Sequence, residues 1–180
     1  MLDILLEASA ATGIAVHEWA QLPTTSLTFS PLLIEACKTN ACGNYNKSWT
    51  CPPACGTMEE QREKILLWEN VFVFTTVYAL EDSFDYDGMT KGRELHTTLT
   101  VELKKRLGDI PVYGAERCPV CKDSDGGSVC AFPKPCVYPE KMIGSIEAAG
   151  IDVSALSKTA GITYSNGANT VTFFTMVLVA

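Results

Sequence analysis

The eight cysteines of this 180-residue chain fall into two compact groups of four. The first quartet is Cys37, Cys42, Cys51 and Cys55, and the second quartet is Cys118, Cys121, Cys130 and Cys136. Thiolates are soft ligands, and four of them in a short loop can supply the complete sulfur shell of a zinc ion or an iron–sulfur cluster. The sequence therefore predicts two sulfur-ligated metal sites with all eight cysteines as candidate ligands.

The spacing of the cysteines favours iron–sulfur clusters over zinc. The two quartets read C-x4-C-x8-C-x3-C and C-x2-C-x8-C-x5-C, whereas structural zinc sites usually pair two short C-x2-4-C knuckles. A proline follows a cysteine at Pro52 and at Pro119, and ferredoxin-type ligand runs also place proline beside a ligand. We therefore expect a [4Fe–4S] cluster in each loop, with zinc as the alternative and with disulfides or free thiols as a further one.

Composition and charge are those of an ordinary globular protein. Apolar residues make up 47% of the chain and charged residues 19%, so we predict a single domain over residues 1–180 that folds around a real core without needing the cysteines as staples. The net charge of −7 argues against nonspecific binding to nucleic acid and against anchoring to an anionic membrane surface.

The two ends of the chain give expectations about its compartment. The first residues, MLDILLEASAATGIAVHEWA, carry acids and no early Lys or Arg, which is unlike a secretory signal. The C-terminal run VTFFTMVLVA is of strand length and too short for a bilayer span. We expect a cytoplasmic protein, and in that compartment clustered cysteines more often bind metal than form disulfides.

The pattern of elements predicts an α/β fold. Thr57 and Glu60 can form a capping box at the start of a helix, and Gly108 and Gly161 follow two further helical patterns. Together the patterns predict helices over 59–69, 93–107, 140–149 and 153–160, strands over 70–80, 110–115 and 171–180, and a loop over 81–89. The expected architecture is a small mixed sheet with flanking helices and two cysteine-rich metal-binding loops.

Other residues that could carry chemistry have more ordinary interpretations. His17 and His96 belong to neither quartet, so we expect structural or surface roles for them. Tyr45 and Trp49 lie inside the first cysteine loop, where aromatic packing would also shield a cluster from water. The acids of residues 81–87 lack EF-hand spacing and predict a solvated loop or a docking patch for a basic partner. The chain has no phosphate loop, nucleophile elbow or dinucleotide fingerprint.

CKTNACGNYNKSWTCPP, which begins at Cys37, contains the motif C-x2-Y-x3-W-x-C-P-P, and CAFPKPCVYPEKMIGSIEAAGIDVSAL contains S-x-E-A-x-G-x-D-V after a cysteine-proline loop. These two segments resemble the two signatures of a family of predicted metal-binding proteins, domain of unknown function 2284. VFVFTTVYALEDSFDYDGM is similar to the middle of such proteins. The resemblance implies metal binding, with Cys37, Cys42, Cys51, Cys118, Cys121, Cys130 and Cys136 as ligands.

The chain departs from the family pattern at two points. KDSDGGSV separates Cys121 from Cys130, where relatives commonly have C-x2-C-x2-C, and this looks like a loop insertion. Cys55 stands where relatives often have an apolar residue, so it is either an additional ligand or a bystander. The distinction matters because three thiolates would leave one iron open to a substrate, whereas four would form a closed centre suited to electron transfer.

These observations predict an iron–sulfur protein with two [4Fe–4S] clusters that passes electrons to a redox partner protein with a positively charged surface. One alternative is an enzyme that uses an open iron at the Cys37, Cys42 and Cys51 site. The other is a zinc-stabilised interaction domain in which the metal serves folding alone. The sequence predicts neither the oligomeric state nor the substrate.

Overall fold

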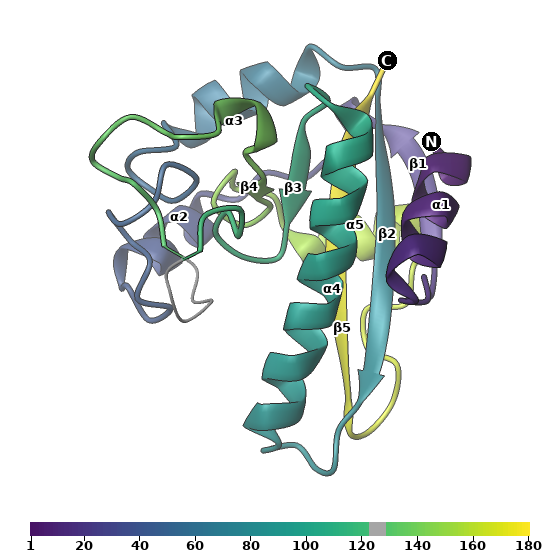
Figure 1. Cartoon of the computed structure of the whole chain (residues 1–180). Helices are drawn as coiled ribbons and strands as arrows, with labels where there is room; N and C mark the ends of the chain where they lie inside the picture. The colour runs from purple at the N-terminus through teal and green to yellow at the C-terminus, as the bar shows by residue number, and fades with distance from the viewer. Residues whose placement is uncertain (123–128) are drawn as a thin grey trace.

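Two runs of β-branched and aromatic residues form the longest strands of the sheet. In the computed structural model, which describes residues 1–122 and 129–180, these strands are β2 (Asn70–Ala79) and β5 (Thr170–Val179). They pair antiparallel along their whole length, from Asn70 opposite Val179 to Ala79 opposite Thr170. Figure 1 shows them running side by side through the molecule. Both strands were predicted, and β2 is buried on both faces as expected.

Three shorter strands complete a five-stranded mixed sheet among the described residues. They are β1 (Trp19–Pro23), β3 (Val112–Gly114) and β4 (Gly144–Ser145), and the sheet has the order β1-β2-β5-β3-β4. The β3–β4 pair is parallel and the other pairs are antiparallel. The strand that comes last in sequence is therefore the central one, and β4 forms one edge.

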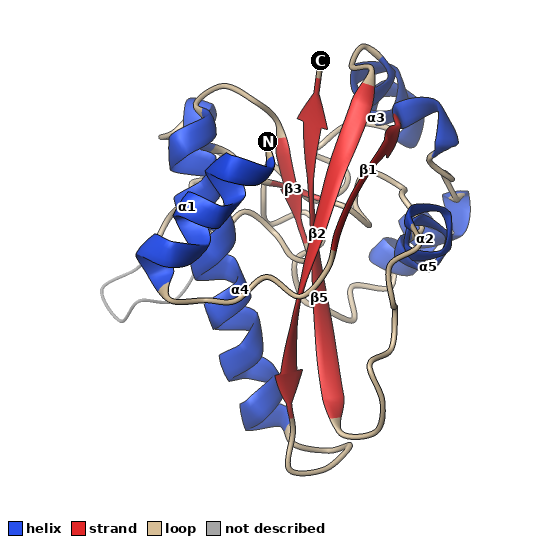
Figure 2. Cartoon of the chain, turned by 90° about the vertical axis from the view of Figure 1, so that its right-hand side faces the viewer, coloured by secondary structure: helices blue, strands red, loops and turns tan. Residues whose placement is uncertain are grey.

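Helices cover both faces of this sheet. Helices α1 (Leu2–Thr12) and α4 (Tyr86–Leu107) lie on one face, and α2 (Pro31–Lys38), α3 (Met58–Leu66) and α5 (Val153–Ala160) lie on the other, as Figure 2 shows. The α/β class with a small mixed sheet and flanking helices is thus confirmed. Within the described ranges, no helix combines the length and the apolar character that crossing a bilayer requires.

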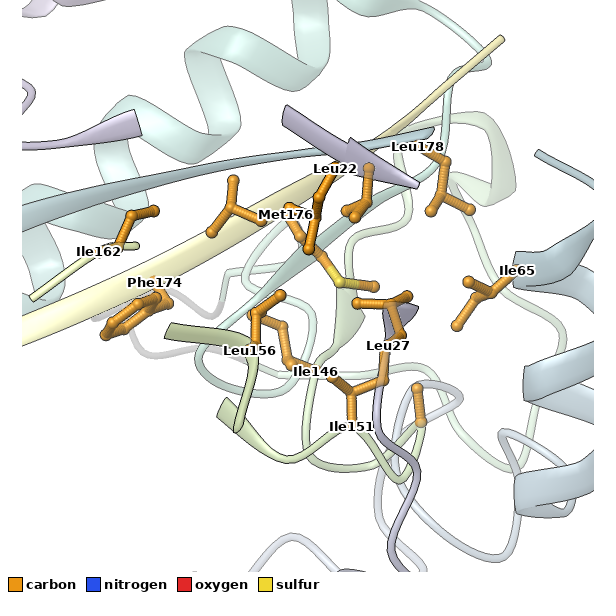
Figure 3. Close-up of a cluster of buried hydrophobic side chains, with 13 residues drawn as sticks. Leu22, Leu27, Ile65, Ile146, Ile151, Leu156, Ile162, Phe174, Met176 and Leu178 are labelled. Atoms are coloured by element: carbon orange, nitrogen blue, oxygen red, sulfur yellow. The ribbon is translucent and has the colours of Figure 1, made fainter. Parts of the chain in front are cut away.

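The alternation of side chains along β2 divides the core into two layers. Val71 and Val73 point into the layer under α3 and α5, whereas Phe72 and Phe74 point into the layer under α1 and α4. Figure 3 shows the first layer, in which β2 and β5 side chains meet Leu156 of α5 and residues of neighbouring turns. Because successive strand residues face opposite sides, both strands must be apolar nearly throughout.

Local capping signals fix the ends of two helices as predicted. The Thr57 hydroxyl accepts a hydrogen bond from the Glu60 amide at 3.1 Å, and the Glu60 carboxylate accepts one from the Thr57 amide at 2.8 Å. Asp152 accepts hydrogen bonds from two amides at the start of α5, and Gly161 ends that helix with φ of 68°. These contacts anchor α3 immediately after the first cysteine loop.

The helix predicted over residues 140–149 is wrong. A short 3-10 helix, Pro139–Lys141, is followed by β4, and Gly144 pairs with Tyr113 of β3. A Cβ atom at Gly144 would lie 2.5 Å from the Tyr113 ring, so the glycine is required by the close packing of the ring on the backbone. Glycine is also a poor helix former, and here strand pairing prevails over the apparent helical pattern.

Helix α4 begins earlier than the predicted residue 93. Asp85 is its N-cap, and the Asp85 carboxylate accepts hydrogen bonds from the amides of Gly88 at 2.8 Å and Glu81 at 3.0 Å. The second half of the predicted 81–89 loop is therefore helical. Helices α1 and α2 and strand β1 had no counterpart among the predicted elements.

Candidate metal centres

The first quartet lies on the connection between α2 and α3. Cys37 is in the last turn of α2, and the remaining three cysteines follow in a loop that folds back on itself. The Asn40 side chain accepts a hydrogen bond from the Tyr45 amide at 3.0 Å, and the Asn46 amide donates to the Pro52 carbonyl at 2.8 Å. These bonds bring the end of the loop back toward α2, and with it the cysteines near that end.

The four thiols of the first quartet interact electrostatically with one another. Burial raises the pKa of Cys51 to about 11, with further increases from Cys42, Cys55 and Cys37. Burial likewise raises the pKa of Cys55 to about 11, with Cys37 adding to the increase. Cys51, which is only 7% exposed, thus interacts with every other member and forms the centre of the group.

The second quartet lies on the long connection between β3 and β4. The Cys118 amide donates to the Thr50 hydroxyl at 2.9 Å, and the Cys118 sulfur accepts a hydrogen bond from the Ile143 amide at 3.4 Å. The Val129 amide donates to the Cys121 carbonyl at 3.0 Å. Most of the predicted KDSDGGSV insertion, residues 123–128, lies outside the described residues.

Electrostatic interactions also join the members of the second quartet. Burial raises the pKa of Cys118, and Cys121 and Cys136 raise it further. Burial raises the pKa of Cys121 as well, with Cys136 and Cys130 adding to the shift. Because the anionic form of each thiol is disfavoured by its neighbours, a cation bound among them would be strongly favoured.

Cys130 differs from the other cysteines. Burial alone would raise its pKa, but hydrogen bonds from the Phe132 and Trp49 amides and from the Ser48 hydroxyl, together with the charge of Arg117, lower the pKa below its ordinary value. Two of these donors belong to the first loop. Cys130 of the second quartet is therefore held by the first loop as well as by its own.

The two cysteine loops contact each other directly. The Trp49 indole N–H donates to the Lys134 carbonyl at 2.9 Å, and the Trp49 ring packs edge-on against Phe132 with centroids 5.0 Å apart. Arg117 interacts with both Cys51 and Cys130, and so carries positive charge to both quartets. Figure 1 shows the two loops together on one side of the sheet, near α2 and β4.

The cysteines of each quartet lie near one another, but among the described residues they are not arranged as a coordination shell. All eight cysteines are free thiols. Among residues 1–122 and 129–180, no three Cys, His, Asp or Glu side chains stand in an arrangement that would hold a metal ion. The donor set is chemically suited to zinc or iron, but sulfur ligands lie about 2.3 Å from such a metal, so the thiols would have to converge to bind it.

Three features near the thiols were not predicted. Arg117 is adjacent in sequence to a candidate ligand, yet its approach to the first quartet depends on the tertiary fold. Glu147, from the S-x-E-A segment, interacts electrostatically with Cys37, and burial raises the pKa of its carboxyl group. A cavity beside Cys55 and Cys136 is the third feature. Its residues come from five separate segments, and no local pattern predicts such a convergence.

The two histidines stand apart from the quartets. The His17 ring is hydrogen-bonded to the Asn166 side chain at 2.9 Å in an exposed position. His96 is buried, and its two ring nitrogens lie 2.8 Å from the hydroxyl oxygens of Thr76 and Thr175. Both have the surface or structural placement that the sequence predicted.

The fold is a mixed α/β sheet with two loops that each carry four free thiols. This combination is typical of metal-binding proteins. The family model described as "Predicted metal-binding protein (DUF2284)" matches residues 20–179. The chain belongs to this family, and the resemblance seen in its cysteine motifs is confirmed. Neither the comparison with curated proteins nor that with solved structures gives a match.

Proposed function

We propose that the protein binds two [4Fe–4S] clusters, one in each quartet, and transfers single electrons to a partner protein in the cytoplasm. The observation that carries the proposal is the gathering of eight free thiols into two separate groups of four. Cys37, Cys42, Cys51 and Cys55 would hold one cluster, and Cys118, Cys121, Cys130 and Cys136 the other. Bound clusters would supply reversible one-electron chemistry at these positions.

The surroundings of the thiols support this assignment. Trp49 and Phe132 pack between the two loops, where they would limit the access of water to a cluster, and Arg117 would offset negative charge at both sites. The net charge of −7 would become more negative with two anionic clusters. Such a charge favours a redox partner with a positively charged docking surface.

Metal and sulfide analysis tests the proposal. After strictly anaerobic purification, we expect about eight irons and eight sulfides per chain and a brown protein whose visible absorption bleaches with dithionite. Iron, sulfide and zinc quantification on the same sample provides the measurement. Stoichiometric zinc in a colourless protein, or a chain without metal, would contradict the proposal.

A second candidate function, catalysis at an open iron, is favoured by the position of Cys55. Its thiol lies on the wall of the cavity and its sulfur is 3.8 Å from the Ala148 carbonyl oxygen. If Cys55 is not a ligand, Cys55→Ala retains about eight irons and an unchanged spectrum. The closed-centre proposal predicts the opposite, a loss of about half of the iron, and Ala54→Gly serves as the neighbouring control with unchanged iron content.

A further inference from the structure

A cavity of about 610 Å³ opens between the two cysteine loops, α3 and the β3–β4 edge of the sheet. This volume lies within the range of small-molecule sites in proteins. Gln61 and Lys64 line it from α3, Tyr113 from β3, and Met142 from the segment before β4. The cavity therefore depends on the tertiary fold and not on one loop alone.

The cavity is distinct from the interior of either quartet. It is lined by Cys55 from the first quartet and Cys136 from the second. The four cysteines of the second quartet line a different and much smaller space, of about 20 Å³, which shares Cys136 with the larger cavity. The larger cavity thus borders both candidate centres without being the volume that a metal would fill.

The walls of the cavity are mostly apolar and firmly built. Pro111, Val112 and Ala148 contribute apolar surface, and Val112 and Ala148 are almost completely buried. The Tyr113 ring lies so close to Gly144 that a Cβ atom there would be 2.5 Å from it. This packing fixes the ring, so the wall that it forms is in place before any ligand arrives.

A few polar groups converge on this apolar space. The Gln61 side-chain amide already has a hydrogen-bond partner within the protein, because it donates to the Cys55 carbonyl. Lys64 lines the cavity at an exposed position, and among the described residues no carboxylate lies within ion-pair distance of its ammonium group. A positive charge at the entrance of an apolar cavity favours a ligand that is itself apolar with one anionic end.

We propose that this cavity binds a small organic molecule with an apolar body of aromatic-ring size and a single carboxylate, which pairs with Lys64. The apolar body lies against Val112, Met142 and the Tyr113 ring. The ligand is held next to Cys55 and Cys136, so it borders both candidate centres. This inference goes beyond the proposed electron transfer and does not require a particular metal.

Calorimetric titration of the anaerobically purified protein with 2-naphthoate and with its uncharged carboxamide, 2-naphthamide, tests the inference. We expect saturable one-to-one binding of both probes and roughly fivefold tighter binding of the carboxylate, the upper range for an exposed ion pair. Lys64→Gln should abolish the fivefold preference and leave 2-naphthamide binding unchanged. Lys91→Gln removes the same charge at an exposed position on α4 outside the cavity, and it should keep the preference.

Met142→Trp provides an independent test of the position of the apolar body. Met142 is 37% exposed, so a larger side chain can be accommodated at the surface while it projects into the cavity. We expect binding of both probes to weaken at least tenfold. Absence of saturable binding to the wild-type protein, equal effects of Lys64→Gln and Lys91→Gln, or unchanged binding to Met142→Trp would each overturn the inference. Metal analysis of the same samples reports separately on the proposed clusters.

Discussion

Cys51→Ser is expected to lower the iron and sulfide content of the protein from the proposed value of about eight of each per chain to about four. Cys51 is the buried centre of the first quartet, because it interacts with Cys37, Cys42 and Cys55. A serine hydroxyl is a harder and less acidic donor than a thiol, and it is a poor replacement for a thiolate ligand of iron. The measurement is iron and sulfide quantification after anaerobic purification, together with the visible spectrum before and after dithionite.

Cys118→Ser is the matched control for this experiment. It removes a partly buried thiol of the second quartet, and we expect it to leave about four irons, those of the first quartet. The double variant should contain none. If Cys51→Ser retained about eight irons, or if each single variant lost all iron while its circular dichroism remained that of the wild type, two independent four-thiolate clusters would be excluded.

The unfolding free energy should fall by about 2 kcal/mol between pH 7 and pH 5, and by about 3 kcal/mol by pH 4, because of His96 alone. Burial lowers the pKa of His96 from 6.5 to about 4, although a backbone hydrogen bond at Phe174 opposes the shift. The ring is enclosed by Phe74 and Phe173 and bonded to Thr76 and Thr175. Within residues 1–122 and 129–180 no carboxylate forms an ion pair with it that would compensate a charge.

The sign follows from proton binding in the two states. Above pH 6.5 the histidine is neutral in both folded and unfolded chains, and its contribution to stability is complete. As the pH falls from 6.5 to 4, the unfolded chain binds a proton that the folded protein rejects, and stability is lost progressively. Below pH 4 the folded protein binds the proton too, and the loss levels off.

Urea unfolding of the wild type and of His96→Gln at pH 7, 6 and 5 isolates this effect. Glutamine can still hydrogen-bond to a threonine hydroxyl but does not titrate. The carboxyl groups and the cysteines titrate alike in both proteins, so the difference between the two pH profiles reports on His96. Parallel profiles would show that the folded protein accepts the proton near the ordinary histidine pKa.

Sequence patterns predicted most of the sheet and the helix boundaries that depend on neighbouring residues. The strand over 70–80 and the final strand were recognisable because both faces of the sheet are covered, which requires apolar residues at nearly every position. The Thr57–Glu60 capping box and the Asp152 cap likewise involve residues three or fewer positions apart. Such local determinants are present in the sequence itself.

Elements that depend on distant partners were missed or misassigned. Residues 140–149 have an apolar spacing that suits a helix, but Gly144 pairs with Tyr113, 31 positions earlier. Strand β1 is only five residues long, with a single buried residue, Leu22, so it has little periodicity of its own. Its position is set by pairing with β2.

In the candidate site, too, the features that depend on neighbouring residues were predicted and those that depend on distant residues were not. The type and spacing of the cysteines predicted two groups of thiols, since each group is compact in sequence. The approach of Arg117 to Cys51 and the hydrogen bonds from Ser48 and Trp49 to Cys130 depend on how the two loops meet. No pattern within either loop contains that information.

The central position of β5 has a consequence for biosynthesis. The chain is made from its N-terminus, so both quartets leave the ribosome before residues 170–179 are available. Until then β2 cannot be joined to β3 and β4, because β5 lies between them in the sheet. The nascent chain therefore presents eight cysteines on an unfinished scaffold. Delivery of the proposed clusters, or protection of these thiols from oxidation, must span that interval.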